Sequence, residues 1–339
     1  MRHASQRNLR DRLLWPGWLA VLLITSAAHA QTCLSAADMD TSVRTALETA
    51  AKRYFEMSVR GDTASLRQNS IPLVAGSFSG VETAVKENQA EFTGARATVR
   101  PPFLLTAEGP QPLARAEFLC GVFGPSGQTG QSAVFVLNNP PPGKYGVVIL
   151  DVTGGQEPRT LTLVLQQVDS DWKLAGYYAR SPKTAGHEAA WFVQRAREFK
   201  AKSQNRNAWL YYREAIALTA PVDFMSTLAT DKLYDELQTV QPADTPVNGN
   251  TVDLTAGNTT YRWTEIYPLG VGNDLDVVVK YSTADISNTQ KTFQDNIAVI
   301  KAVVAKFPEL RDAFAGVVAR AVDPSGHDYG SMLPMKEIK

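Results

Sequence analysis

The chain has 339 residues, of which 34 are Lys or Arg, 34 are Asp or Glu, and 44% are hydrophobic. This composition is that of an ordinary globular protein, and it argues against a disordered chain, a collagen-like fibre and a multi-disulfide scaffold. Nucleic-acid binding depends on clustered Lys and Arg side chains. The balanced charge therefore gives no reason to expect nucleic acid as a partner.

The first 30 residues have the pattern of a secretory signal peptide. Four arginines precede an apolar stretch from Leu13 to Ala27, which is followed by the small-x-small pattern of Ala28–Ala30 that signal peptidase recognises. An uncleaved membrane anchor is the alternative, but the apolar run is shorter than the about 20 residues that a spanning helix needs. We therefore predict cleavage after Ala30, export to the periplasm or the extracellular space, and no membrane span after cleavage.

Two cysteines remain after the predicted cleavage, Cys33 and Cys120. An even pair in an oxidising compartment indicates one disulfide, with two free thiols as the alternative. The stretch from Leu113 to Phe123 alternates as a strand does, which places Cys120 on its inward face. The residues expected on that apolar face are Ala114, Ala116, Phe118, Cys120 and Val122.

Three helices are predicted ahead of the first core strand. A capping-box pattern at Ser35–Asp38 precedes apolar residues at helical spacing, and Gly61 ends this first helix. Asp62 is placed to cap a short second helix over residues 62–66, and a third helix is expected over about 79–92. Period-two alternation then predicts six strands near residues 97–106, 113–123, 131–138, 145–153, 159–168 and 171–180.

This order of elements resembles the ketosteroid-isomerase-like cone, also called the nuclear-transport-factor-like fold, over about residues 36–180. The resemblance rests on the element order, on the segment Ala-Lys-Arg-Tyr-Phe-Glu-Met-Ser-Val-Arg-Gly-Asp (51–62), and on the hairpin at Trp172. It implies an α+β domain in which three helices pack on a curved antiparallel sheet, with an apolar concave face that takes a small hydrophobic ligand. The Pro140–Pro142 loop departs from the pattern, because it is long for this fold.

Helical periodicity returns at His187. The spacing of apolar residues over about 187–220 resembles one tetratricopeptide-type helical hairpin, and a third helix is expected over about 226–239. A free-standing array needs about three such units to bury a continuous core. A helical connector packed against its neighbours is therefore the favoured interpretation.

The remaining sequence predicts a small α+β lobe in which we recognise no family. Its expected elements are strands near 259–267, 275–282 and 316–322, a short helix starting at Pro308, and a helix whose apolar stripe holds Phe293, Ile297, Ile300, Val304 and Phe307. The predicted organisation is a signal peptide (1–30), a cone-like α+β domain (31–182), a helical connector (183–240), a linker (241–250) and the small α+β domain (251–339).

The sequence offers few residues or motifs for catalysis, cofactor binding or metal binding. After cleavage the histidines are His187 and His327, and neither lies in the cone. His327 stands in Ser325-Gly-His-Asp328, but neighbours in one turn do not converge as a catalytic triad does. The sequence contains no metal-binding, P-loop, nucleophile-elbow or dinucleotide motif. We therefore predict no catalytic, cofactor-binding or metal-binding residue.

The leading hypothesis is a non-enzymatic, exported binding or interaction protein, whose partner is a small hydrophobic ligand or another exported protein. A docking surface formed by aromatic residues is one variant, and the residues concerned are Trp191, Trp209, Tyr211 and Tyr212. The alternative is a cone-type isomerase or dehydratase that uses an Asp and a Tyr as an acid–base pair. The residues available for it are Tyr54, Tyr145, Tyr177, Tyr178, Asp62 and Asp151.

Overall fold

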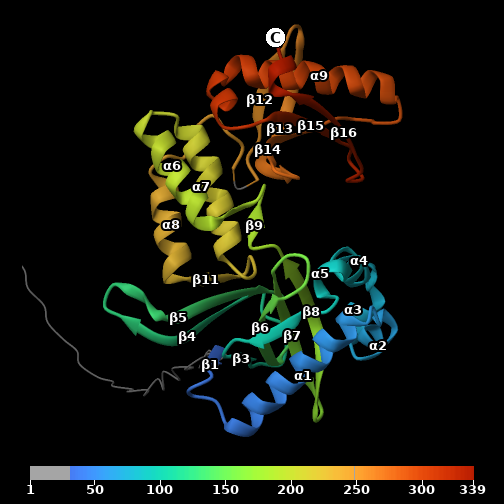
Figure 1. Cartoon of the computed structure of the whole chain (residues 1–339), viewed down its shortest axis with the longest axis vertical. Helices are drawn as coiled ribbons and strands as arrows, with labels where there is room; N and C mark the ends of the chain where they lie inside the picture. The colour runs from blue at the N-terminus through green and yellow to red at the C-terminus, as the bar shows by residue number, and fades with distance from the viewer. Residues whose placement is uncertain (1–30, 248) are drawn as a thin grey trace, which may run out of the picture.

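The computed structural model describes residues 31–247 and 249–339, so the predicted signal peptide lies outside the described residues. The chain is an α+β protein. Figure 1 shows an N-terminal lobe at the bottom, a layer of three helices in the middle and a C-terminal lobe at the top. No helix within the two described ranges is long and apolar enough to cross a membrane.

The N-terminal lobe begins with a strand and five helices, followed by seven strands. The helices are α1 (Thr41–Val59), α2 (Thr63–Gln68), α3 (Pro72–Gly76), α4 (Ser79–Glu87) and α5 (Gln89–Phe92). The strands are β1 (Gln31–Leu34), β2 (Arg96–Val99), β3 (Phe103–Ala107), β4 (Arg115–Gly124), β5 (Gly127–Asn138), β6 (Gly143–Thr153), β7 (Arg159–Val168) and β8 (Asp171–Arg180).

Local interactions explain where these helices begin. Asp62 caps α2 as predicted, because its carboxylate accepts a hydrogen bond from the Ser65 N–H at 3.0 Å. The capping box expected at Ser35 is not formed: its hydroxyl donates to the Asp38 carboxylate within a turn, and α1 starts only at Thr41. Pro72, whose fixed φ suits the first helical position, begins the additional helix α3.

One antiparallel sheet forms the centre of this lobe. Its strand order is β1-β3-β6-β7-β8, with β2 also paired to β6. Helices α1–α5 cover one face, and the long β4–β5 hairpin lies on the other (Figure 1). Side chains that alternate along β7 serve both faces: Leu163 and Leu165 enter the core under the helices, whereas Val164 enters the core under the hairpin.

A short strand ties the middle of the molecule to this hairpin. β11 (Met225–Thr227) follows the second helix of the middle layer and pairs antiparallel with β5, so that the second sheet has the order β11-β5-β4. The Val136 N–H extends this pairing by donating to the Phe224 carbonyl at 2.9 Å. The N-terminal lobe and the helical layer thus share a sheet.

The remaining elements form the helical layer and the C-terminal lobe. The small strands β9 (Lys183–Thr184) and β10 (His187–Glu188) precede α6 (Ala189–Ala201), α7 (Asn205–Thr219) and α8 (Leu228–Gln238). The C-terminal lobe contains β12 (Val252–Ala256), β13 (Thr259–Val271), β14 (Asp274–Ser282), α9 (Thr289–Lys306), β15 (Gly316–Val322) and β16 (Asp328–Pro334), with short 3-10 helices at Pro308–Asp312 and Met335–Glu337. Its sheet runs β12-β13-β14-β15-β16, and α9 connects the parallel pair β14 and β15.

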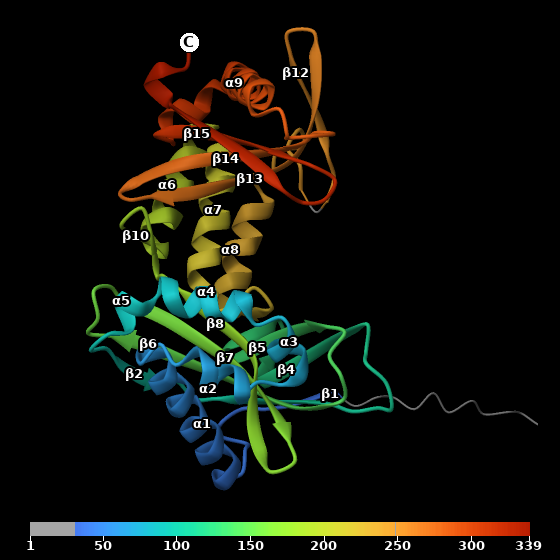
Figure 2. The same ribbon diagram turned by 90° about the vertical axis from the view of Figure 1, so that its right-hand side faces the viewer.

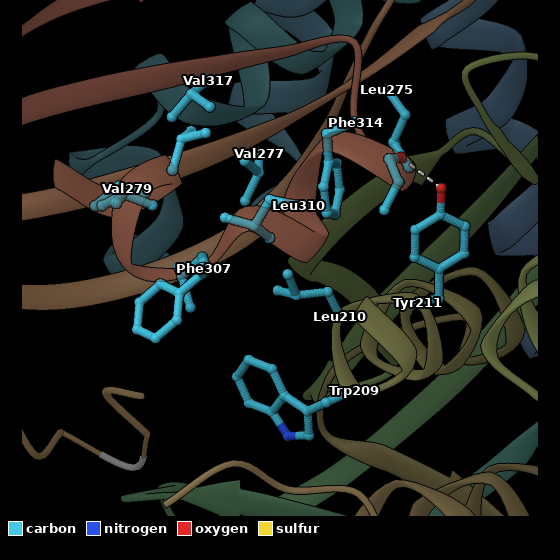
Figure 3. Packing of buried hydrophobic residues seen from close by; sticks show 14 of the residues in the cluster. Trp209, Leu210, Tyr211, Leu275, Val277, Val279, Phe307, Leu310, Phe314 and Val317 are labelled. Atoms are coloured by element: carbon cyan, nitrogen blue, oxygen red, sulfur yellow. Dashed lines mark hydrogen bonds between the residues drawn. The ribbon is translucent and has the colours of Figure 1, made fainter. Parts of the chain in front are cut away.

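The helical layer and the C-terminal sheet share one hydrophobic core. Leu210 and Tyr211 of α7 lie opposite Leu310 and Phe314, and the Tyr211 hydroxyl donates to the Ala313 carbonyl at 2.7 Å (Figure 3). Figure 2 shows the C-terminal sheet resting on the three helices. The helices therefore have the packed neighbours that the connector interpretation requires, and these neighbours include the lobe beyond the predicted linker.

Two details of the C-terminal lobe differ from the sequence-based expectation. The strands β12 and β16 were not predicted. Phe293, expected on the apolar stripe of α9, is 48% exposed, because the buried side of the helix passes through Thr292, Asn296 and Ile300. Asn296 is tolerated there, since its amide donates to the Tyr329 carbonyl and its oxygen accepts from the Tyr281 hydroxyl.

Candidate functional site

The two sheets of the N-terminal lobe are joined covalently. Cys33 of β1 and Cys120 of β4 form a disulfide, with their Cα atoms 5.0 Å apart and a sequence separation of 87. Cys120 is fully buried in the core between the sheets. This bond fixes the central sheet against the β4–β5 hairpin at one end of the space that they enclose.

Two residues of the predicted inward face lie elsewhere: Ala114 is exposed and precedes β4, and Val122 faces solvent. Ala116, Phe118 and Cys120 are buried as expected, whereas Val122 is 58% exposed. The cause is a β-bulge at Gly121, whose φ of +80° shifts the register of β4 against β5 before Phe123. The bulge reverses the alternation, so the expectation for Val122 was wrong.

An apolar pocket opens at the end of the inter-sheet space where the Pro140–Pro142 loop leaves β5. We call it the tyrosine–proline pocket, and its volume is about 650 Å3. It is lined by Ile71, Pro72, Leu73, Val136, Leu137, Asn138, Asn139, Pro140, Pro141, Tyr145, Val164, Gln166, Val168, Ala175, Tyr178 and Phe224. The elements that supply these residues are the start of α3, the end of β5, the strands β6–β8 and the segment before β11.

Two phenols stand in this lining. The Tyr145 hydroxyl donates to the Pro141 carbonyl at 2.5 Å, which holds the proline loop against β6. The ring of Tyr178 packs edge-on against Phe224 with the ring centres 5.4 Å apart. Burial raises the pKa of both tyrosines, so both hydroxyls are protonated at neutral pH. Because Tyr145 already donates its proton to Pro141, its oxygen can accept a hydrogen bond, whereas the Tyr178 hydroxyl can donate one. The Gln166 amide is a further polar group in the wall.

No Asp or Glu is among the residues that line this pocket. The two aspartates considered for acid–base chemistry have other roles. Asp62 caps α2, and Asp151 forms an exposed ion pair with Arg100, at 2.6 Å. The structure therefore brings neither aspartate to a tyrosine of the pocket.

The other two tyrosines belong to the core under the helices. The Tyr54 hydroxyl lies 2.8 Å from the Asn69 carbonyl and 2.9 Å from the Trp172 carbonyl, and Tyr177 donates to the Ser58 hydroxyl at 3.1 Å. Burial raises the pKa of Tyr177 well above its usual value. These bonds satisfy buried polar groups, and the tyrosine–proline pocket lies on the opposite face of the sheet.

A second pocket of about 610 Å3 lies at the other end of the inter-sheet space, beside the bulge of β4. Phe103, Ile149 and Met225 form part of its wall, and Val122 and Arg100 stand at it as well. Asp38 also lines this pocket, and Arg100 is paired with Asp151.

The histidines and the aromatic residues of the helical layer are structural. His187 stacks on Trp191 with the ring centres 3.7 Å apart. His327 is exposed in a turn, where its Nδ1 lies 2.8 Å from the Ser325 hydroxyl. Among the described residues, no group of three His, Cys, Asp or Glu side chains is placed to hold a metal ion.

The predicted aromatic docking surface is largely buried. Trp209, Tyr211 and Tyr212 are at most 3% exposed and belong to the core shared with the C-terminal sheet. Trp191 is partly buried against the same core. These side chains pack the protein's own elements together and leave little surface for a partner.

Three features noted in the sequence contribute to the tyrosine–proline pocket, namely Tyr145, Tyr178 and the long Pro140–Pro142 loop. The sequence pattern did not identify Leu73 or Phe224, which reach the pocket from distant parts of the chain. Searches against protein-family models, curated proteins and solved structures find no match to this chain.

Proposed function

We propose that this chain is an exported, non-enzymatic binding protein and that its tyrosine–proline pocket takes a small apolar ligand. The observation that supports this function most strongly is the chemistry of the wall. It is mainly aliphatic, aromatic and proline side chains, with two phenols and the amides of Asn138, Asn139 and Gln166 as the groups that can orient a ligand. Ligand sites commonly combine such a lining with a few polar groups and a volume of about 300–1,000 Å3.

The absence of a carboxylate from this lining favours binding over the isomerase or dehydratase alternative. Abstraction of a proton needs a base within hydrogen-bond reach of the substrate. Phenols whose pKa is raised by burial are donors at neutral pH and poor bases. The Tyr178 hydroxyl is therefore suited to donate to a polar atom of the ligand, and the Tyr145 oxygen is suited to accept from one.

Export is part of the same proposal. Disulfides persist mainly in oxidising compartments outside the cytosol. The Cys33–Cys120 bond is compatible with that location, and it supports the signal peptide predicted from residues 1–30. We assign the protein to the periplasm or the extracellular space on these grounds.

The two family resemblances complete the proposal. A cone-like domain of the ketosteroid-isomerase type is supported by helices packed on one face of an antiparallel sheet. A tetratricopeptide-like hairpin is supported by the packing of α6 against α7. The proposed ligand pocket is lined by the sheet face towards the β4–β5 hairpin and by the start of α3, so it differs from a cavity enclosed between α1 and the sheet.

Fluorescence titration with the neutral dye N-phenyl-1-naphthylamine tests the pocket. We expect saturable enhancement with wild-type protein and at least about tenfold weaker binding for Leu73→Asp, because the new carboxylate must lose water when an apolar ligand binds. Leu73 is 74% exposed, so the variant should fold.

Two matched substitutions locate the dye. Val122→Asp places the same charge at the second pocket, and Leu119→Asp places it on the outer side of β4; both residues are exposed. Wild-type affinity is expected for both. Equal weakening by Leu73→Asp and Leu119→Asp, or no saturable binding by wild type, would contradict the proposal.

A further inference from the structure

A separate cavity of about 380 Å3 lies where α7, α8 and β13 meet. Trp209 and Arg213 reach it from α7, Tyr234 from α8, and Thr264 and Glu265 from β13. It has no lining residue in common with the tyrosine–proline pocket. Unlike that pocket, it contains a positively charged side chain.

Arg213 has no acidic partner among the described residues. Its Nη1 donates to the Ile266 carbonyl at 2.5 Å, and its guanidinium lies over the Trp209 ring, 4.7 Å from the ring centre. Within the described part of the chain, no hydrogen bond uses its Nε or Nη2, and neither atom is sealed from solvent. These N–H groups are therefore available to a molecule in the cavity.

The surroundings make this arrangement unusual. Burial lowers the pKa of Arg213, yet an arginine remains charged at any physiological pH. The charges of Glu265 and Glu214 act on Arg213, but no carboxylate of the described residues forms an ion pair with its guanidinium. A ligand carboxylate in direct contact would add the ion pair that these side chains do not form. A planar carboxylate suits a guanidinium especially well, because it accepts two parallel hydrogen bonds.

The neighbouring charges restrict the ligand to a single negative charge. Glu265 lines the same cavity, and its charge is balanced by Lys280 at 2.8 Å. A dianion would exceed the one available positive charge. Arg213 also lines a neighbouring cavity of about 380 Å3 whose wall contains Asp223 and Asp231. Because these carboxylates repel an anion, the cavity beside β13 is the favoured place for it.

We propose that the cavity at Arg213 binds a small monocarboxylate, whose carboxylate pairs with the guanidinium and whose planar or apolar body lies against Tyr234. Tyr234 is 51% exposed and supplies an aromatic wall, and Leu237 and Val247 line the same cavity. The site is independent of the tyrosine–proline pocket, so failure of one proposal leaves the other standing.

Titration calorimetry of the wild-type chain with benzoate, benzamide and inorganic phosphate tests the assignment. We expect benzoate to bind at least about tenfold more tightly than its neutral counterpart benzamide, and phosphate to bind more weakly than benzoate. Benzoate should not displace N-phenyl-1-naphthylamine. Equal affinity for benzoate and benzamide, or a preference for phosphate, would overturn the proposal.

Variants of Arg213 on α7 and of two residues on β13 distinguish the loss of one charge from a general loss of structure. Arg213→Met keeps an unbranched, flexible side chain but removes the guanidinium, and it should abolish benzoate binding, whereas Arg262→Met, at an exposed arginine of β13, should bind as wild type does. Glu265→Gln should tighten benzoate binding at least about threefold, since it removes a repelling charge. Unchanged benzoate affinity in Glu265→Gln would contradict the proposal. This test remains valid if Arg213→Met does not fold.

Discussion

At the scale of single residues, Gly121 determines which side of β4 the residues after it face. Its φ of +80° lies in the region that glycine adopts easily and other residues do not. A Cβ at this position would overlap the Gln131 carbonyl of the paired strand. The residue therefore meets two separate requirements, a backbone conformation and a close approach of the neighbouring strand.

Substitution of two glycines separates those requirements. Gly121→Ala should lower the free energy of unfolding by about 3 kcal/mol or more, because backbone strain and overlap add. Gly127→Ala should cost only about 1 kcal/mol, since its φ is also positive, at +103°, but open space surrounds it. Urea denaturation measures both, and equal losses would mean that the overlap is relieved by a small shift of β5.

Gly121 also explains one limit of reading strands from sequence. The alternation Ala116, Phe118, Cys120 correctly gives the buried face of β4, and extending it by one step to Val122 fails. A bulge depends on the register with another strand, which the local pattern does not contain. Arg213 is a similar case, because its lack of an acidic partner depends on β13 and α8.

At the scale of elements, a cluster of charged and polar groups joins the three helices of the middle layer. Glu236 of α8 receives two hydrogen bonds from Arg197 of α6, at 2.6 and 2.9 Å, and one from the Tyr212 hydroxyl of α7, at 2.7 Å. Chiefly because of Arg197, the pKa of Glu236 falls from 4.5 to about 2.

This lowered pKa predicts a loss of stability in acid. A carboxyl group whose pKa is lower in the folded than in the unfolded chain stabilises the fold above the unfolded value, here about pH 4.5, and this contribution disappears as the pH falls towards 2. Solvent exposure of the ion pair limits it to about 1 kcal/mol. Urea denaturation between pH 7 and 2 measures the change.

Two variants test whether Glu236 causes the loss of stability in acid. Glu236→Gln should lose about 1 kcal/mol at pH 7 and depend less on pH over this range. Glu56→Gln, at an exposed residue of α1 that pairs with no charged side chain of the described residues, should follow the wild-type curve. An unchanged pH profile for Glu236→Gln would show that other carboxyl groups cause the loss.

Elements with strong local signals were predictable, and those that depend on neighbours were not. β7 and β8 lie at the predicted residues 159–168 and 171–180, because their apolar residues alternate and Asp169-Ser170 turns the chain. β16 contains Gly330 and ends at Pro334, residues that disfavour strands. It forms because β15 provides an edge with which to pair.

At the scale of the whole molecule, the shared core should make the helical layer and the C-terminal sheet unfold together. Leu310 is fully buried in this core, and its replacement by alanine should cost about 2–5 kcal/mol. In hydrogen exchange measured by mass spectrometry, Leu310→Ala should reduce protection equally in α7 and β14 and leave β7 unchanged.

The N-terminal core offers the matching control. Leu163→Ala, equally buried but under α1–α5, should reduce protection in β7 and leave α7 and β14 unchanged. Loss of protection in β14 alone after Leu310→Ala would show that α7 is stable without the sheet.

The pairing of β11 with β5 has a practical consequence for anyone who divides this protein. A fragment that stops at residue 182 lacks β11 and Phe224, so it uncovers the backbone of Ala133–Val136 along β5 and one wall of the tyrosine–proline pocket. An uncovered strand edge readily pairs with other chains. Such a fragment should aggregate and bind poorly, whereas one extended through Thr227 retains the missing edge.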